Sequence, residues 1–131
     1  MGIHIRNFGI TFFVFMVVDL IWLGLIAKNL YAKYLGYIMA EKVNWSAAII
    51  FYILFIIGLI YFVITPADSI KDVIVSGALF GLITYATYDL TNLATLKNWP
   101  ITITIIDLIW GTTLATVTSA VSYLIINGLG K

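Results

Sequence analysis

Three aspartates lie inside stretches of sequence that are otherwise apolar: Asp19, Asp89 and Asp107. A charged side chain at the centre of a bilayer costs about 2.5–3.5 kcal/mol on insertion scales, so carboxyl groups in such stretches are rare and need a reason. Asp19 and Asp107 each begin the same four-residue motif, Asp-Leu-Ile-Trp, which ends at Trp22 in one case and at Trp110 in the other. A carboxyl group one helical turn from an indole could hold a proton, or could bind a cation together with the aromatic face.

The elements that must position these acids follow from the composition. The chain has 131 residues, of which 63% are hydrophobic and 10% are charged, against roughly 25% charged in an ordinary soluble domain. Four apolar stretches are long enough to cross a bilayer. We therefore predict an all-α integral membrane protein, a single domain folded as a four-span transmembrane helix bundle with both termini on the same side. The predicted spans are residues 8–27, 46–64, 71–93 and 100–126.

Several classes of function lack support in the sequence. The net charge of +1 gives no basic field for nucleic acid. The chain has no cysteine, and His4 is the only histidine, which cannot build a zinc site by itself. No phosphate-binding loop, nucleophile elbow or dinucleotide fingerprint is present. We expect no cofactor and no metal, and we can name no catalytic residue.

The longest predicted connection, residues 28–45, combines helically spaced Leu and Tyr residues with several charges. It is either a continuation of the first helix or a short amphipathic helix in the headgroup region. Tyr31, Tyr34, Tyr37 and Trp45 suit an aromatic belt at that level. The second span is apolar all round and is expected to be the most lipid-exposed, with Asn44 as its N-cap.

The third and fourth spans contain most of the remaining polar groups. Tyr85, Tyr88 and Asn92 fall beside Asp89 and could satisfy its carboxyl by hydrogen bonds. Ser69 with Asp72 resembles a capping box, and Asn98 is a plausible cap for the fourth helix. The predicted inward face of the fourth span contains Thr104, Asp107, Gly111, Ala115, Thr118 and Ser122. The glycines that allow close helix packing are Gly77, Gly81 and Gly111.

Helical spacing also predicts the depths of the acids. Measured from the side of the 28–45 connection, Asp89 should lie one turn deep, Asp107 about 10 Å deep and Asp19 about 15 Å deep. The three acids should therefore lie at increasing depths between this interface and the middle of the membrane. If both Asp-Leu-Ile-Trp motifs line one pocket formed by the first, third and fourth spans, Asp19 and Asp107 come together. Two carboxylates within about 4–6 Å cannot both ionise comfortably, so one would keep its proton.

Three classes of function remain open. One is a small transporter or channel in which the acids exchange protons or cations for an unidentified small molecule or ion. Another is a membrane-embedded enzyme acting on lipid, which is less favoured because no nucleophile or oriented base is recognisable. The last is a structural subunit of a membrane complex, in which each aspartate is neutral and hydrogen-bonded. The candidate binding residues are Asp19, Trp22, Tyr85, Tyr88, Asp89, Asn92, Thr104, Asp107 and Trp110.

The chain resembles a family of small bacterial predicted membrane proteins, the domain-of-unknown-function family 2177. The resemblance rests on the two Asp-Leu-Ile-Trp motifs and on the third-turn motif from Tyr88 to Pro100. It implies four spans and no chemistry, in the bacterial inner (cytoplasmic) membrane. The chain is also similar in architecture, more loosely, to the small multidrug resistance transporters. The nearly balanced Lys and Arg residues of the two sides permit dual insertion and an antiparallel homodimer in membrane lipid.

Overall fold

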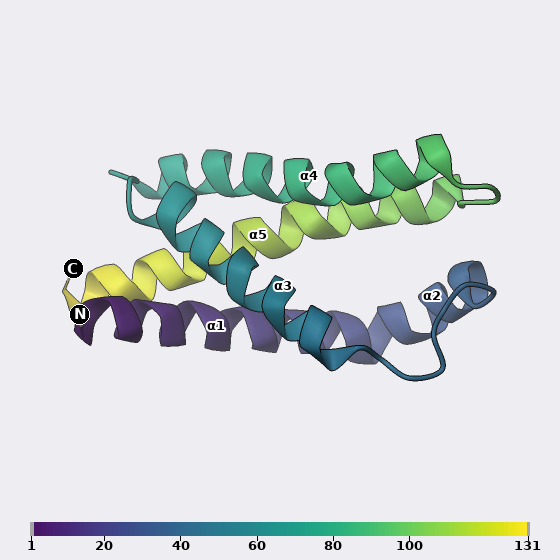
Figure 1. The fold of residues 1–131 in the computed structure, drawn as a ribbon. Coiled ribbons are helices and arrows are strands. Elements are labelled where there is room, and N and C mark those ends of the chain that lie inside the picture. The colour runs from purple at the N-terminus through teal and green to yellow at the C-terminus, as the bar shows by residue number, and fades with distance from the viewer. Residues whose placement is uncertain (1, 131) are drawn as a thin grey trace.

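The computed structural model describes residues 2–130 and consists of helices joined by short turns (Figure 1). The elements are α1 (Gly2–Trp22), η1 (Leu23–Ala27), α2 (Lys28–Leu35), α3 (Trp45–Gly58), η2 (Leu59–Ile64), α4 (Ile70–Thr95) and α5 (Ile101–Leu129), where η marks a π-helical segment. Four helical stretches are long and apolar enough to cross a membrane, at residues 2–38, 45–64, 70–95 and 101–129. The predicted fold class is thereby confirmed.

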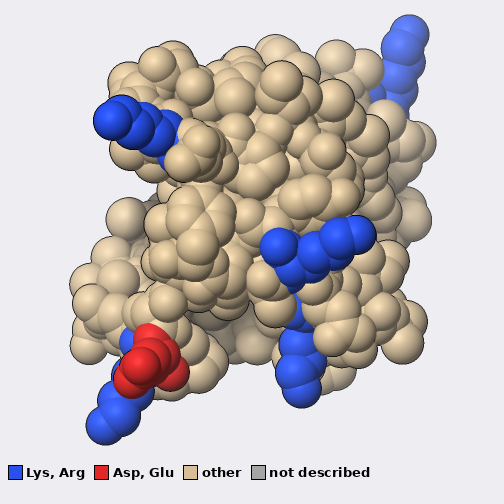
Figure 2. All heavy atoms as spheres, turned by 90° about the vertical axis from the view of Figure 1, so that its right-hand side faces the viewer, with Lys and Arg blue, Asp and Glu red and all other residues tan. Residues whose placement is uncertain are grey.

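The four stretches alternate in direction, so the described ends of the chain meet at one end of the bundle (Figure 1). Arg6 of α1 donates a hydrogen bond of 2.7 Å to the carbonyl oxygen of Gly130 there. The opposite end has the connections 36–44 and 96–100, and Figure 2 shows its charged side chains, mostly Lys and Arg, scattered among uncharged residues. Between the two ends the surface is apolar, with Phe13 and Leu25 more than two-thirds exposed, as expected of a lipid-facing exterior.

Local sequence signals fix several helix ends. The Asn44 side chain accepts a hydrogen bond of 3.2 Å from the Ala47 backbone N–H, and Ser69 accepts one from Asp72 N–H, as predicted. The Asp72 carboxylate in turn accepts from the backbone N–H of Asp68. The predicted cap at Asn98 is wrong. Its backbone has a φ of 62°, so it forms the turn before Pro100 and does not begin α5.

The first helix continues through η1 into α2 without a break, which is one of the two forms predicted for this connection. The expectation that the second span is the most lipid-exposed is wrong. It contributes Phe55, Ile56, Leu59, Val63 and Ile64 to the core, whereas α4 buries only Val73, Gly77, Gly81 and Asp89. A helix that is apolar all round gives no sign of which face packs inward, so the sequence could not reveal this contact.

Candidate functional site

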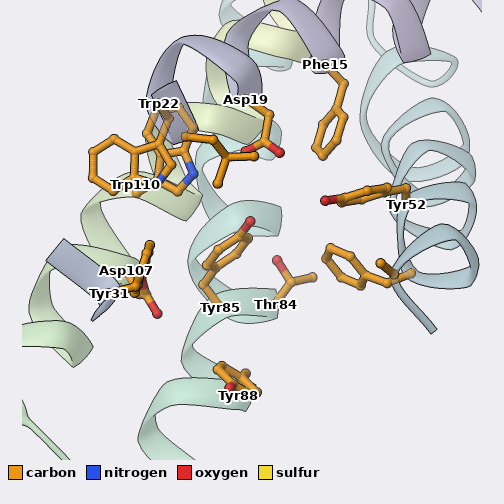
Figure 3. Close-up of a pocket in the computed structure, with 13 residues that line it drawn as sticks. Phe15, Asp19, Trp22, Tyr31, Tyr52, Thr84, Tyr85, Tyr88, Asp107 and Trp110 are labelled. Atoms are coloured by element: carbon orange, nitrogen blue, oxygen red, sulfur yellow. The ribbon is translucent and has the colours of Figure 1, made fainter. Parts of the chain in front are cut away.

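A cavity of about 510 Å³ opens between the helices in the half of the bundle nearer the 96–100 turn. All four long helical stretches contribute to its wall, so the second span also lines the pocket that we predicted from the other three. Its lining combines two acids with eight aromatic side chains and a few small or apolar residues (Figure 3). The lining residues are Phe15, Asp19, Trp22, Leu23, Tyr31, Ala48, Phe51, Tyr52, Thr84, Tyr85, Tyr88, Asp107 and Trp110.

The two Asp-Leu-Ile-Trp motifs contact each other through their tryptophan side chains. The rings of Trp22 and Trp110 stack with centroids 4.4 Å apart and planes inclined by 8°. Because α1 and α5 run in opposite directions, their acids, Asp19 and Asp107, lie on opposite sides of this stack, offset by about 9 Å along the bundle. Tyr85 stands between the two acids and faces both (Figure 3). The stacked indoles therefore form one flat wall with a carboxyl at each end.

Asp107 is held by a residue that we had assigned to the interfacial belt. The Tyr31 hydroxyl of α2 donates a hydrogen bond to Oδ1 of Asp107, which is itself 6% exposed. Tyr31 lies beyond η1, and no residue pattern in the sequence marks a π-helical segment. The spacing of Tyr31 from Trp22 therefore could not identify it as a member of the site.

A ladder of small residues brings α4 against α5. Gly77 faces Ser119, Gly81 faces Ala115, and the Tyr85 ring lies over Gly111. A β-carbon at Gly81 would lie 2.7 Å from the Ala115 Cβ, and one at Gly111 would overlap the Tyr85 ring. Only glycine therefore fits at these two positions. The close packing predicted at Gly77, Gly81 and Gly111 is what these contacts describe.

The next step of the same ladder places Asp89 opposite Asp107. Each step moves four residues forward along α4 and four residues back along α5, so the pair after Tyr85 and Gly111 is Asp89 with Asp107. The packing register of the two helices therefore places the two carboxyl groups opposite each other. Asp89 is completely buried, and neither of its oxygens has a hydrogen bond of acceptable geometry within residues 2–130.

The helix ends correct the expected depths of two of the acids. Asp89 lies six residues before the end of α4 at Thr95, and Asp107 lies six residues after the start of α5 at Ile101. Both are therefore about 9 Å from the turn. They lie at the same depth, whereas the sequence predicted that Asp89 would lie closer to this side than Asp107. The register of α4 and α5 also places Asp107 opposite Asp89. Asp19 and Asp107 line the same cavity, and their direct pairing stays a prediction.

The nine candidate residues divide into three groups. The cavity lining includes Asp19, Trp22, Tyr85, Tyr88, Asp107 and Trp110. Asp89 lies behind Asp107, and Asn92 lies beside the Tyr88 hydroxyl without lining the cavity. Thr104 accepts a hydrogen bond of 3.1 Å from Trp99 Nε1 and donates to the Pro100 carbonyl, so it ties the turn to α5.

Sequence reasoning missed part of the wall. Phe15, Phe51 and Tyr52 are aromatic residues in apolar runs, where nothing distinguishes a cavity-lining ring from a lipid-facing one. Phe15 lies one turn before Asp19 and so shares its helix face, which is the only signal that could have found it. Thr84 donates to the backbone carbonyl of Phe80 at 2.9 Å, leaving its hydroxyl oxygen as an acceptor at the cavity.

The charge of the cavity has one sign. No Lys, Arg or His lies among the lining residues within 2–130, so the carboxyls of Asp19 and Asp107 have no basic partner there. Over the same residues, no group of three His, Cys, Asp or Glu side chains could hold a metal ion. Chemically, this wall can attract a positive charge, bind it through carboxyl groups, and cover it with aromatic faces.

Comparison with known proteins gives one match. The model of a family described as "Predicted membrane protein (DUF2177)" matches residues 4–124, which is nearly the whole chain. Neither the curated proteins nor the solved structures gave a match.

Proposed function

The chain belongs to the DUF2177 family of predicted membrane proteins, and from this premise we propose that its cavity binds a small organic cation and gives up protons in exchange. The observation that carries the proposal is the lining itself. Two carboxyl groups and eight aromatic side chains share one cavity with no basic residue from the described chain. Such a site inside the bundle is what a carrier needs for the central step of transport.

The lining argues against other classes of ligand. An anion would be repelled by Asp19 and Asp107 and would find no basic group to bind. A lipid tail or another neutral apolar molecule would leave both carboxyls without a positively charged partner in a low dielectric, which is unfavourable. A cation relieves both problems, because it supplies the missing positive charge.

The aromatic wall favours an organic cation over a metal ion. Hard metal ions need about six or more oxygen ligands at short distances, and most of this wall is ring carbon. A cation over an aromatic face gains about 0.5–2 kcal/mol, and the Trp22–Trp110 stack offers a flat surface beside Asp19. The volume of about 510 Å³ suits a molecule with an apolar body.

The test uses two probes of the same shape and different charge. Phenyltrimethylammonium and its neutral carbon analogue, tert-butylbenzene, are titrated into purified protein in lipid nanodiscs, and tryptophan fluorescence reports occupancy of the cavity. We expect saturable binding of the cation and much weaker binding of the neutral analogue.

The matched variants are Asp19→Asn and Asp68→Asn. Asp19 lines the cavity, whereas Asp68 is an exposed acid in the turn before α4. Asp19→Asn should weaken cation binding by about tenfold or more, which corresponds to about 1.4 kcal/mol. Asp68→Asn should leave it unchanged. Equal affinity for the two probes, or an unaltered affinity in Asp19→Asn, would refute the proposal.

A further inference from the structure

We propose that the Asp89–Asp107 pair is the proton site of this protein, holding one proton between two carboxyl groups and releasing it when a cation enters the cavity. The exchange part rests on the proposed function, whereas the shared proton can be tested without any ligand. The carboxyl that opens on the cavity, Asp107, connects the ligand space to the buried acid behind it.

The position of the pair follows from helix packing. The contacts Gly77–Ser119, Gly81–Ala115 and Tyr85–Gly111 set one register between α4 and α5. That register, continued by one turn beyond Tyr85 and Gly111, places Asp89 opposite Asp107. Glycines on both helices hold the backbones together one to three turns away, which resists a sideways shift of one helix.

Asp89 provides an independent indication that a proton is bound. Its side chain is completely buried, and both of its oxygens lack a hydrogen-bond partner of acceptable geometry within the described chain. Two adjacent ionised carboxylates that are both buried would be strongly unfavourable. One proton between them turns the repulsion into a hydrogen bond and satisfies an otherwise unpaired oxygen.

Within residues 2–130, the groups around the pair offer no other source of positive charge. Tyr31 of α2 donates its hydroxyl to Asp107, and Tyr85 and Tyr88 of α4 line the same cavity as Asp107 (Figure 3). Two other titratable side chains line the cavity. They are Asp19 of α1 and Tyr52 of α3, which faces Asp19. These neighbours are hydroxyls and one further acid, so a proton or a bound cation must balance the charge of the pair.

The exchange balances in charge. In the empty cavity, one proton and two carboxylates give the pair a net charge of −1. When a monovalent organic cation binds at the cavity face of Asp107, the proton leaves through the cavity to water. The pair then carries −2 and the cation +1, which again sums to −1. One cation is therefore exchanged for one proton without burying additional net charge.

The ligand-free test is infrared spectroscopy of the protein in nanodiscs at neutral pH. The shared proton predicts a carbonyl stretching band of a protonated carboxylic acid that is lost in Asp89→Asn, because the amide donates a permanent hydrogen bond to an ionised Asp107. Asp68→Asn is the matched acid-to-amide control and should retain the band. A spectrum in which Asp89→Asn leaves the band unchanged would overturn the shared proton.

The second test counts protons released per phenyltrimethylammonium bound, in weakly buffered solution with a pH indicator. The intact protein should release one proton per cation, and its affinity should rise by up to tenfold for each pH unit, since protons compete with the cation. Asp89→Asn should release about none and should lose this pH dependence. If Asp89→Asn does not fold, Asp107→Asn must show the same loss of release.

The outcomes separate the two proposals. Absence of cation binding in the intact protein would refute the proposed function, and the infrared band would still decide the proton site. Binding with one proton released in the intact protein and also in Asp89→Asn would leave the function standing and overturn the assignment of the proton to this pair.

Discussion

Helix α5 packs against two neighbours in contrasting ways. Toward α4 it presents small residues, and the backbones approach so closely that a β-carbon at Gly81 would collide with Ala115. Toward α1 it presents Trp110, whose ring stacks on Trp22. The first interface is tight and brings two carboxyls together. The second is held open by large flat side chains and borders a cavity.

The difference shows how a small bundle can hold both a proton site and a ligand site. Small side chains let two helices pack closely, so that a buried acid on one helix has a fixed position relative to the other helix. Rings hold helices farther apart and leave space that no side chain fills. Asp107 belongs to both interfaces, because the α4–α5 register places it opposite Asp89 and its side chain also lines the cavity.

Breaking the tight interface should have the largest effect. Gly81→Val adds side-chain atoms where the Gly111 carbonyl and Ala115 already lie, so we expect destabilisation of about 1–3 kcal/mol or more. The control is Gly9→Ala, because nothing lies within 4 Å of a β-carbon at Gly9. In an α-helix this change should be stabilising by about 0.5–1 kcal/mol. Thermal unfolding in detergent, followed by circular dichroism, should shift in opposite directions for the two variants.

Altering the open interface should change binding more than stability. Trp22→Leu removes the stacked ring at the cavity wall, which contributes about 0.5–1.5 kcal/mol beyond its buried area. We expect a small decrease in melting temperature. Phenyltrimethylammonium affinity should fall about threefold to thirtyfold as the cation–π contact is lost. Trp45→Leu is the matched control, since Trp45 is 63% exposed. Equal losses of affinity in the two variants would contradict this division of roles.

A single hydrogen bond can be tested where the two interfaces meet. Tyr31→Phe keeps the ring and removes the hydroxyl that donates to Asp107. The loss should be about 0.5–3 kcal/mol, depending on whether the carboxyl is charged. Tyr37→Phe is the control, because its hydroxyl bonds the Asn98 carbonyl in an exposed turn. Comparing their melting temperatures with and without phenyltrimethylammonium should show a ligand-dependent difference for Tyr31→Phe alone.

Much of this arrangement within single helices could be predicted from the sequence. All six residues assigned to the inward face of the fourth span are buried in α5: Thr104, Asp107, Gly111, Ala115, Thr118 and Ser122. A stripe of small and polar residues on a spanning helix has a distinct environment, so its periodicity can be read directly. The caps at Asn44 and Ser69 follow from equally local chemistry.

Relations between helices were harder to predict. Pairing Asp107 with Asp19 rests on their matching four-residue motifs, whereas the α4–α5 register places Asp89 opposite Asp107. The signal was present in the four-residue spacing of Gly77, Gly81, Tyr85 and Asp89 against Asp107, Gly111, Ala115 and Ser119. To use this spacing, one must know that the short 96–100 turn makes α4 and α5 antiparallel neighbours in a fixed register. For the apolar second span no such spacing exists.

The π-helical segment η1 determines the directions in which the side chains of α2 point. A wider turn accommodates roughly one residue more than an α-helical turn, so the faces of the helix on either side differ by about 100° from those of an uninterrupted α-helix. Tyr31 follows η1, and Asp19 and Trp22 precede it. Removing one residue from this segment, such as Gly24, would leave a regular helix of nearly the same composition and would turn the Tyr31 hydroxyl away from Asp107. The length of the first helix, counted in residues, is therefore part of the site.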